Sequence, residues 1–225
     1  MKKIKYVVLG LSLSLFLLLT AMELVTFNTN HFMKQYERNN IFETVVIDES
    51  NLEYITLQII SYLSNDLDSL KIEALWNNEI REVFSERELE HMKDVKNLFV
   101  LGRRVKLLSL SILIFGITFI LRYDSLWSKN ISKTLLCTSI CNYGLMLGLY
   151  ICIKSDFTKY FDKFHYVFFS NDLWMLDPNT EILVQILPEP FFYNTAIKIA
   201  LMFFIPLTIL GLCSTYYLFT RKVFE

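Results

Sequence analysis

The sequence predicts an all-α membrane protein with four transmembrane helices and a mainly helical extracytoplasmic cap formed by two loops. Of its 225 residues, 53% are hydrophobic, and the mean hydropathy of +0.38 is typical of a membrane protein. Four long runs carry no charged residue, and most of the charge lies in two long segments between them. We expect a single membrane domain that covers residues 1–225.

Each uncharged run is long enough to cross a bilayer once its flanks are included, since a spanning helix needs about 20 apolar residues. Lysines precede the first run, as they do in a signal peptide. No small-x-small cleavage site follows it, so we expect a retained anchor. The expected spans cover residues of about 6–26, 104–122, 133–153 and 197–220.

The distribution of charge predicts which side of the membrane each segment faces. With the N-terminus inside, the inner segments 1–5, 122–133 and 221–225 carry eight Lys or Arg residues against two carboxylates. An excess of basic residues in short loops favours the cytoplasmic side. We therefore expect both termini in the cytoplasm, with segments 27–103 and 154–196 and all three histidines outside.

Two helices are predicted in the first outer segment. One begins near Asp48 and runs to residue 63, with its apolar residues on one stripe. The other begins at Ser85, where Glu88 three residues later completes a capping box, and it continues into the second span. His91 therefore lies on a helix that descends into the membrane.

His91 and His165 are the candidate catalytic residues. Asp94 lies one helical turn after His91 and is placed to orient its imidazole. His165 belongs to a segment whose phenylalanines recur at helical spacing, and burial against aromatic rings lowers the pKa of a histidine. Taken singly, each histidine fits an ordinary interfacial residue better than a catalytic one. We interpret His31, just after the first span, as interfacial.

Residues near these histidines are candidates for supporting or substrate-binding roles. Arg103 and Arg104 mark the outer end of the second span, where they either snorkel to the interface or contact a lipid headgroup or substrate carbonyl. Glu23, just past the first uncharged run, is either an interfacial charge or a partner for these cations. The supporting set is completed by Asp94, Phe164, Phe168, Asp172 and Trp174.

Several kinds of function are disfavoured by composition and spacing. The net charge of −1 offers no basic field for nucleic acid. The sequence has no Gly-rich phosphate loop, no zinc-type spacing and no G-x-S-x-G elbow. The four cysteines lie in apolar runs. We therefore expect no metal site, no disulfide and no cofactor.

Two stretches together resemble one family. The second span is preceded by SERELEHMKDVKNLF, and the fourth by FHYVFFSNDLWMLDPNTEILVQILPEPFF. Both resemble the lipoprotein intramolecular transacylase (Lit) family, whose members are integral membrane proteins of Gram-positive bacteria. The family's first-loop helix is similar to DESNLEYITLQIISYL. The loop between His31 and Asp48 does not match closely, although the resemblance covers the whole four-span plan.

The resemblance implies a reaction and a site. The family moves the sn-2 acyl chain of a diacylglyceryl lipoprotein onto the α-amino group of its N-terminal cysteine, which gives a lyso-form lipoprotein. The two essential histidines of the family would correspond to His91 and His165. The implied partners are the lipoprotein substrate and membrane lipid, with no nucleic acid, no cofactor and a monomeric enzyme.

This reaction needs a base for the amine, a donor for the oxyanion and an acid for the leaving alkoxide. We assign the base to His165, because its aromatic setting favours the neutral form, and the donor or acid to His91. The reverse assignment is nearly as well supported. Two other functions stay open. One is a non-catalytic membrane subunit whose outer domain binds lipid or a partner protein. The other is a two-step acyltransferase or lipase that uses Ser170 with His165.

Overall fold

The computed structural model describes residues 3–45, 47–76 and 79–224. The chain divides into two compact units, and each is described by itself. One unit holds the predicted spans and the other holds the two predicted outer segments. The first consists of Met1–Met22, Arg103–Ser155 and Ile199–Glu225, and the second of Glu23–Gly102 and Asp156–Lys198.

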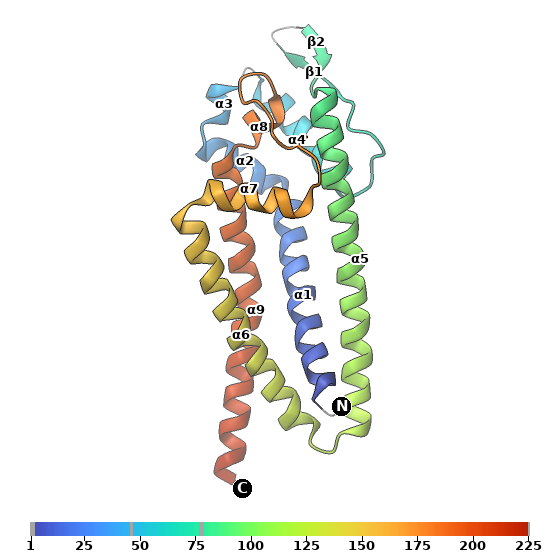
Figure 1. Cartoon of the computed structure of the whole chain (residues 1–225), viewed down its shortest axis with the longest axis vertical. Helices are drawn as coiled ribbons and strands as arrows, with labels where there is room; N and C mark the ends of the chain where they lie inside the picture. Colours follow the sequence, from blue (N-terminus) through green and yellow to red (C-terminus); the bar gives the residue numbers. More distant parts are fainter. Residues whose placement is uncertain (1–2, 46, 77–78, 225) are drawn as a thin grey trace. The chain divides into compact units, whose positions relative to one another are not determined.

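In the part of the chain that the structure describes, four long helices are apolar enough to cross a membrane; Figure 1 shows their course. Each contains an 18-residue window with a mean hydropathy between 1.6 and 2.2, and only 11–22% of each window is buried inside the protein. Such exposed apolar surface fits contact with lipid. The prediction of an all-α membrane protein with four spans is therefore confirmed. The helices are α1 (Ile4–Thr26), α5 (Glu86–Tyr123), α6 (Trp127–Ser155) and α9 (Glu189–Phe224).

Small residues let the helices of the first unit approach one another. A Cβ atom on Gly10 of α1 would lie 2.5 Å from Thr138 Oγ1 of α6, and one on Gly211 of α9 would lie 3.3 Å from Ser139 Cβ. Ser139 also donates a hydrogen bond to the carbonyl of Leu207 at 3.0 Å. Close backbone approach and hydroxyl hydrogen bonds are the usual means by which membrane helices associate.

The second unit is built from short helices and one hairpin, together with the adjoining ends of α1, α5 and α9. Its own elements are α2 (Thr29–Arg38), α3 (Ile41–Thr44), α4 (Glu49–Leu63), β1 (Glu73–Trp76), β2 (Glu79–Glu82), α7 (Phe157–Phe168) and α8 (Ile182–Ile186).

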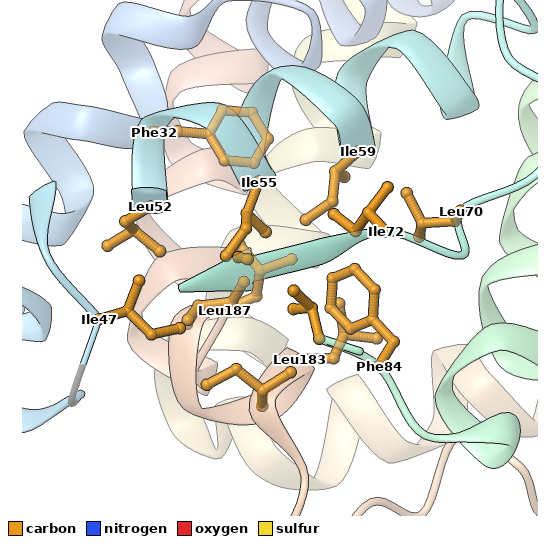
Figure 2. Close-up of a cluster of buried hydrophobic side chains, with 14 of the residues drawn as sticks. Phe32, Ile47, Leu52, Ile55, Ile59, Leu70, Ile72, Phe84, Leu183 and Leu187 are labelled. Atoms are coloured by element: carbon orange, nitrogen blue, oxygen red, sulfur yellow. The ribbon is translucent and has the colours of Figure 1, made fainter. Parts of the chain in front are cut away.

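The core of the second unit joins the two outer segments of the chain. Figure 2 shows Ile55 and Ile59 of α4 pointing into the same cluster as Leu183 of α8. α4 begins as predicted, because the carboxylate of Asp48 accepts a hydrogen bond from the Asn51 amide at 2.9 Å. Burying one isoleucine or leucine side chain in this core stabilises the fold by about 1.5–3 kcal/mol. This core therefore holds together segments that are far apart in the sequence.

The hairpin of the second unit was not predicted. β1 and β2 pair antiparallel, with Glu73 opposite Glu82. Ala74 is buried in the core, whereas Ile80 is 72% exposed. Strands of four residues are too short to show a reliable alternation of apolar and polar residues.

His31, which was predicted to be interfacial, is buried in α2. Its Nε2 lies 2.9 Å from Thr195 Oγ1. That hydroxyl donates its own hydrogen to the Phe191 carbonyl at 2.7 Å, so Nε2 carries the hydrogen that is donated to Thr195. Burial, together with the positive charge of Lys198, lowers the pKa of His31 to about 4. His31 is thus a neutral structural link between α2 and α9.

Glu88 joins the start of α5 to α8. The Ser85 amide donates to Glu88 Oε2 at 2.6 Å, and the Glu88 amide donates to Ser85 Oγ at 3.3 Å, which confirms the predicted capping box. The second carboxylate oxygen, Oε1, accepts from the Leu183 amide at 2.6 Å. The side chain is 1% exposed. Both oxygens therefore satisfy backbone amides that are shielded from water.

Glu88→Gln should lower the free energy of unfolding by about 1–3 kcal/mol. Glutamine has one accepting oxygen where glutamate has two, so one of the two backbone amides loses its acceptor. Thermal unfolding of the detergent-solubilised protein, followed by tryptophan fluorescence, measures the effect. Glu90→Gln is the matched control, since Glu90 is an exposed residue on the same helix. Equal Tm values for Glu88→Gln and the wild type would contradict this prediction.

Stability should also fall with pH because of His31. Its pKa is lowered to about 4 in the folded state, so the unfolded state takes up the proton at higher pH. The contribution of His31 to stability is therefore complete above about pH 6.5 and is lost as the pH falls towards 4. In His31→Gln, an amide replaces the titrating ring, and Tm should decline less over this interval. Parallel curves of Tm against pH for the two proteins would disprove the assignment.

Candidate active site

α7 carries His165 beside a row of aromatic rings. The helix is capped by Asp156, whose carboxylate accepts from the Lys159 amide at 3.0 Å. Phe157 and Phe161 stack with their ring centroids 5.5 Å apart. His165 follows one turn later on the same face, because residues four apart on a helix are neighbours. The local sequence therefore directs the imidazole into an aromatic environment.

A backbone carbonyl sets the tautomer of His165. The Nδ1 atom lies 2.8 Å from the carbonyl oxygen of Phe161. Since a carbonyl oxygen only accepts hydrogen bonds, Nδ1 carries the hydrogen and Nε2 keeps its lone pair. Nε2 is therefore the atom that can accept a proton from a substrate.

Four aromatic rings surround the imidazole of His165. Trp174 stacks on it, with centroids 4.6 Å apart and an angle of 18° between the planes. Phe161 and Phe164 meet it edge-on at 4.5 and 5.5 Å, and Phe169 is tilted at 5.8 Å. Burial lowers the pKa of His165 below its ordinary value, and the hydrogen bond to Phe161 opposes this only in part. The imidazole is therefore neutral at pH 7.

His91 faces His165 from α5. The two ring centroids are 6.2 Å apart, with 40° between the planes. Phe169 meets His91 edge-on at 5.3 Å, so one phenyl ring packs on both imidazoles. His91 is 7% exposed, and its Nδ1 is buried without a hydrogen-bond partner. An unpaired buried nitrogen is costly in a structural histidine and useful in one that meets a substrate.

Two hydrogen bonds hold the segment 171–175 against α5. Asn171 Nδ2 donates to Asp94 Oδ2 at 2.8 Å, and Arg87 Nη2 donates to the carbonyl of Asp172 at 2.6 Å. They fix the backbone just before Trp174, and so fix the indole that covers the site. Neither Arg87 nor Asn171 was predicted, because each acts through a contact between segments far apart in the sequence.

The role predicted for Asp94 differs from the observed geometry. Asp94 was expected to orient the imidazole of His91. Within the described part of the chain, no hydrogen bond links the two side chains, and the Asp94 carboxylate accepts from Asn171 instead. A spacing of three residues on a helix brings two side chains near each other but does not decide which partner a carboxylate takes.

A pocket of about 260 Å³ is lined by Phe169, the residue whose ring packs on both His91 and His165. α5 lines it with Asp94, Asn97, Leu98 and Leu101, and the segment 168–171 forms the other wall. Its lining is thus partly polar and partly apolar. Sites that enclose a whole drug-sized ligand have volumes of about 300–1,000 Å³. This pocket therefore suits one fragment of a lipid better than a complete lipid.

The second unit contains most but not all of the predicted supporting residues. Phe168 lines the pocket, and Asp172 contributes its backbone carbonyl rather than its carboxylate. Arg103 and Arg104 belong to the first unit. Among the residues that the structure describes, no group of three His, Cys, Asp or Glu is placed to hold a metal ion.

Comparison with known proteins places this fold in one family. Residues 7–192 match the family model of the lipoprotein intramolecular transacylase Lit. The solved structure of that membrane-integral enzyme from Bacillus cereus is 24% identical with a TM-score of 0.76, and the match covers 99% of this chain and 98% of that chain. A variant of the same enzyme with one histidine replaced by alanine has the same identity and TM-score, and covers 99% and 96%.

Another organism has a relative of similar length. An uncharacterised protein from Aquifex aeolicus is 27% identical over 186 residues, which is 80% of each chain. Identities this low show the fold alone, whereas the family model covers most of the chain. The chain belongs to the lipoprotein intramolecular transacylase (Lit) family of multi-pass membrane enzymes.

Proposed function

We propose that this enzyme moves the sn-2 acyl chain of a diacylglyceryl-cysteine lipoprotein onto the α-amino group of the same cysteine. The family supplies the class of substrate, a lipoprotein. The observation that carries the proposal is the pair of buried histidines. His165 keeps a basic Nε2 and His91 has an unpaired Nδ1, with their rings 6.2 Å apart. The reaction needs one basic nitrogen and one donor close together.

His165 acts first, as the general base. An α-amine has a pKa of about 7.7–8.0, so at neutral pH the ammonium first releases one proton to solvent. Nε2 of His165 takes a second proton while the nitrogen attacks the carbonyl carbon of the sn-2 ester. A C–N bond forms, and the carbonyl electron pair moves onto oxygen. His91 donates an N–H to this oxyanion.

The same two histidines complete the transfer. When the oxyanion collapses, the bond between the carbonyl carbon and the sn-2 oxygen of glycerol breaks. The imidazolium of His165 gives its proton to that oxygen, which leaves as a hydroxyl group. The product is an N-acylated lyso-form lipoprotein, and no second lipid donor is consumed.

The enzyme's contribution is mainly orientation and exclusion of water. Donor and acceptor belong to one molecule, and attack closes a ring of about eight atoms, so fixing the geometry removes much of the entropic barrier. The aromatic rings of Phe161, Phe169 and Trp174 exclude water that would hydrolyse the ester.

The surface of α7 supports a site at the depth of the lipid headgroups. α7 follows α6 directly, with only Asp156 between them. The helix exposes several aromatic and aliphatic side chains, and such side chains favour the bilayer interface. Together with the charge distribution, this supports an orientation in which His165 lies at the extracytoplasmic face and both termini lie in the cytoplasm. The exposed apolar residues of α7 are Phe164, Tyr166, Val167 and Phe168, at 44–76% exposure.

His91→Ala and His165→Ala should each lower the rate of transfer by at least about 100-fold, since each removes a group that moves or holds a proton or charge. The measurement is mass spectrometry of a lipoprotein N-terminus from cells that lack other N-acylation. Wild-type enzyme should give an N-acyl lyso-form, with fragmentation showing loss of the sn-2 chain. Ser170→Ala is the matched control in the adjoining pocket and should stay active.

Each alternative outcome has a distinct signature in the same experiment. Activity in either histidine variant would remove that residue from the mechanism. Unchanged diacylglyceryl cysteine, with wild-type enzyme present in the membrane, would contradict the transacylase and favour a non-catalytic subunit. An acyl group trapped on Ser170 would favour the two-step route.

The acid limb of the pH profile of kcat should lie below about pH 6.5, because burial lowers the pKa of His165 and the neutral ring is the active base. Trp174→Leu removes the stacked indole, lets water reach the imidazole and should move the acid limb back towards pH 6.5. Both profiles are measured with a synthetic diacylglyceryl lipopeptide. An acid limb at or above pH 6.5 in the wild type would contradict the assignment of His165 as base.

A further inference from the structure

We infer that Asp94 binds the α-ammonium group of the substrate's N-terminal cysteine, and so lets the enzyme distinguish its substrate from its N-acylated product. The inference rests on the proposed function and adds to it a specificity-determining residue. The structure shows Asp94 in the wall of the pocket beside the histidine pair.

Asp94 is the charged residue in the lining of this pocket, which contains no Lys or Arg. Its Oδ2 accepts from Asn171 at 2.8 Å, which holds the carboxylate in one orientation. An ionised carboxylate has about four lone-pair sites, so Oδ1 keeps the capacity to accept from a cation. A lining with one carboxylate and no cationic side chain favours a cationic group over a neutral one.

The position of the pocket brings such a cation next to the base. Phe169 lines the pocket and also packs on both imidazoles, at 5.3 Å from His91 and 5.8 Å from His165. Once an ammonium group held by Asp94 has lost one proton to solvent, its nitrogen is therefore close to the imidazole that takes the second proton. Apolar lining from Leu98 and Leu101 suits the lipid part of the same substrate.

The charge of the nitrogen changes in the reaction. Before transfer the nitrogen is an ammonium that makes a charge-assisted hydrogen bond to a carboxylate, which is about twice as strong as a neutral one. After transfer the nitrogen is an amide, which is neutral. Asp94 therefore binds the substrate well and the product poorly, and it favours release of the product.

The test compares two unreactive ligands of the full-length enzyme in detergent micelles. Both are diacylglyceryl-cysteine peptides in which ether links replace the esters, so neither can react. One has a free amine and the other is N-acetylated. At pH 7 the wild type should bind the free amine about 10- to 100-fold more tightly than the acetylated ligand, as expected for one charge-assisted hydrogen bond.

Three variants locate the source of this preference. Asp94→Asn keeps the size and can still accept from Asn171, but it should bind both ligands equally. Asp94→Glu keeps the charge and should retain part of the preference. Glu90→Gln removes a negative charge from an exposed position on the same helix and should behave as the wild type.

The pH dependence separates a charge effect from a loss of structure. The wild-type preference should shrink above about pH 8, as the amine loses its proton, and Asp94→Asn should show no such change. Equal binding of the two ligands by the wild type would overturn the inference, as would an undiminished preference in Asp94→Asn or loss of both ligands in that variant. Failure of the proposed function has a different signature, because the wild type would then form no N-acyl lipoprotein.

Discussion

The buried carboxylate of Glu88 is the interaction on which the geometry of the site depends. It accepts hydrogen bonds from the Ser85 and Leu183 amides, and so fixes the first turn of α5 to α8. The segment 171–175 lies between α7 and α8 in the chain, so it is held at both ends. Arg87 and Asp94, close to Glu88 on α5, then bond to this segment. Because these contacts act together, the indole of Trp174 and the two imidazoles have one arrangement.

The hydrogen bond from His165 to the Phe161 carbonyl, in place of a carboxylate, makes His165 a weak base. In a Ser-His-Asp triad, a carboxylate holds the tautomer of the histidine and also stabilises the imidazolium. Here a neutral carbonyl sets the tautomer, and the aromatic rings disfavour the charged form. Such a base holds a proton only weakly. That property suits the transfer that we propose, in which the proton must pass quickly from the amine to the oxygen of glycerol.

Local patterns predicted much of the fold, and long-range contacts account for the rest. Hydropathy located the four spans, and short-range capping located Asp48 and Ser85 at helix starts, because each signal lies within a few residues. The burial of His31 depends on Thr195 and Phe191, which lie near the other end of the chain. Neither Arg87 nor the partner of Asp94 has a local signature, so only the folded chain shows them. His91 and His165 were named as a pair through the resemblance, and their 6.2 Å separation is a property of the fold.

An intramolecular transfer has to favour one nucleophile over another. Water is a competitor for the same ester, and a neutral base beside the carbonyl would activate either nucleophile. Aromatic rings around His165 exclude water without discriminating among apolar groups. A carboxylate in the adjoining pocket adds that discrimination, because it attracts the cationic amine and has no comparable attraction for water. The apolar enclosure and the single carboxylate therefore act on the same choice, namely which nucleophile reaches Nε2 of His165.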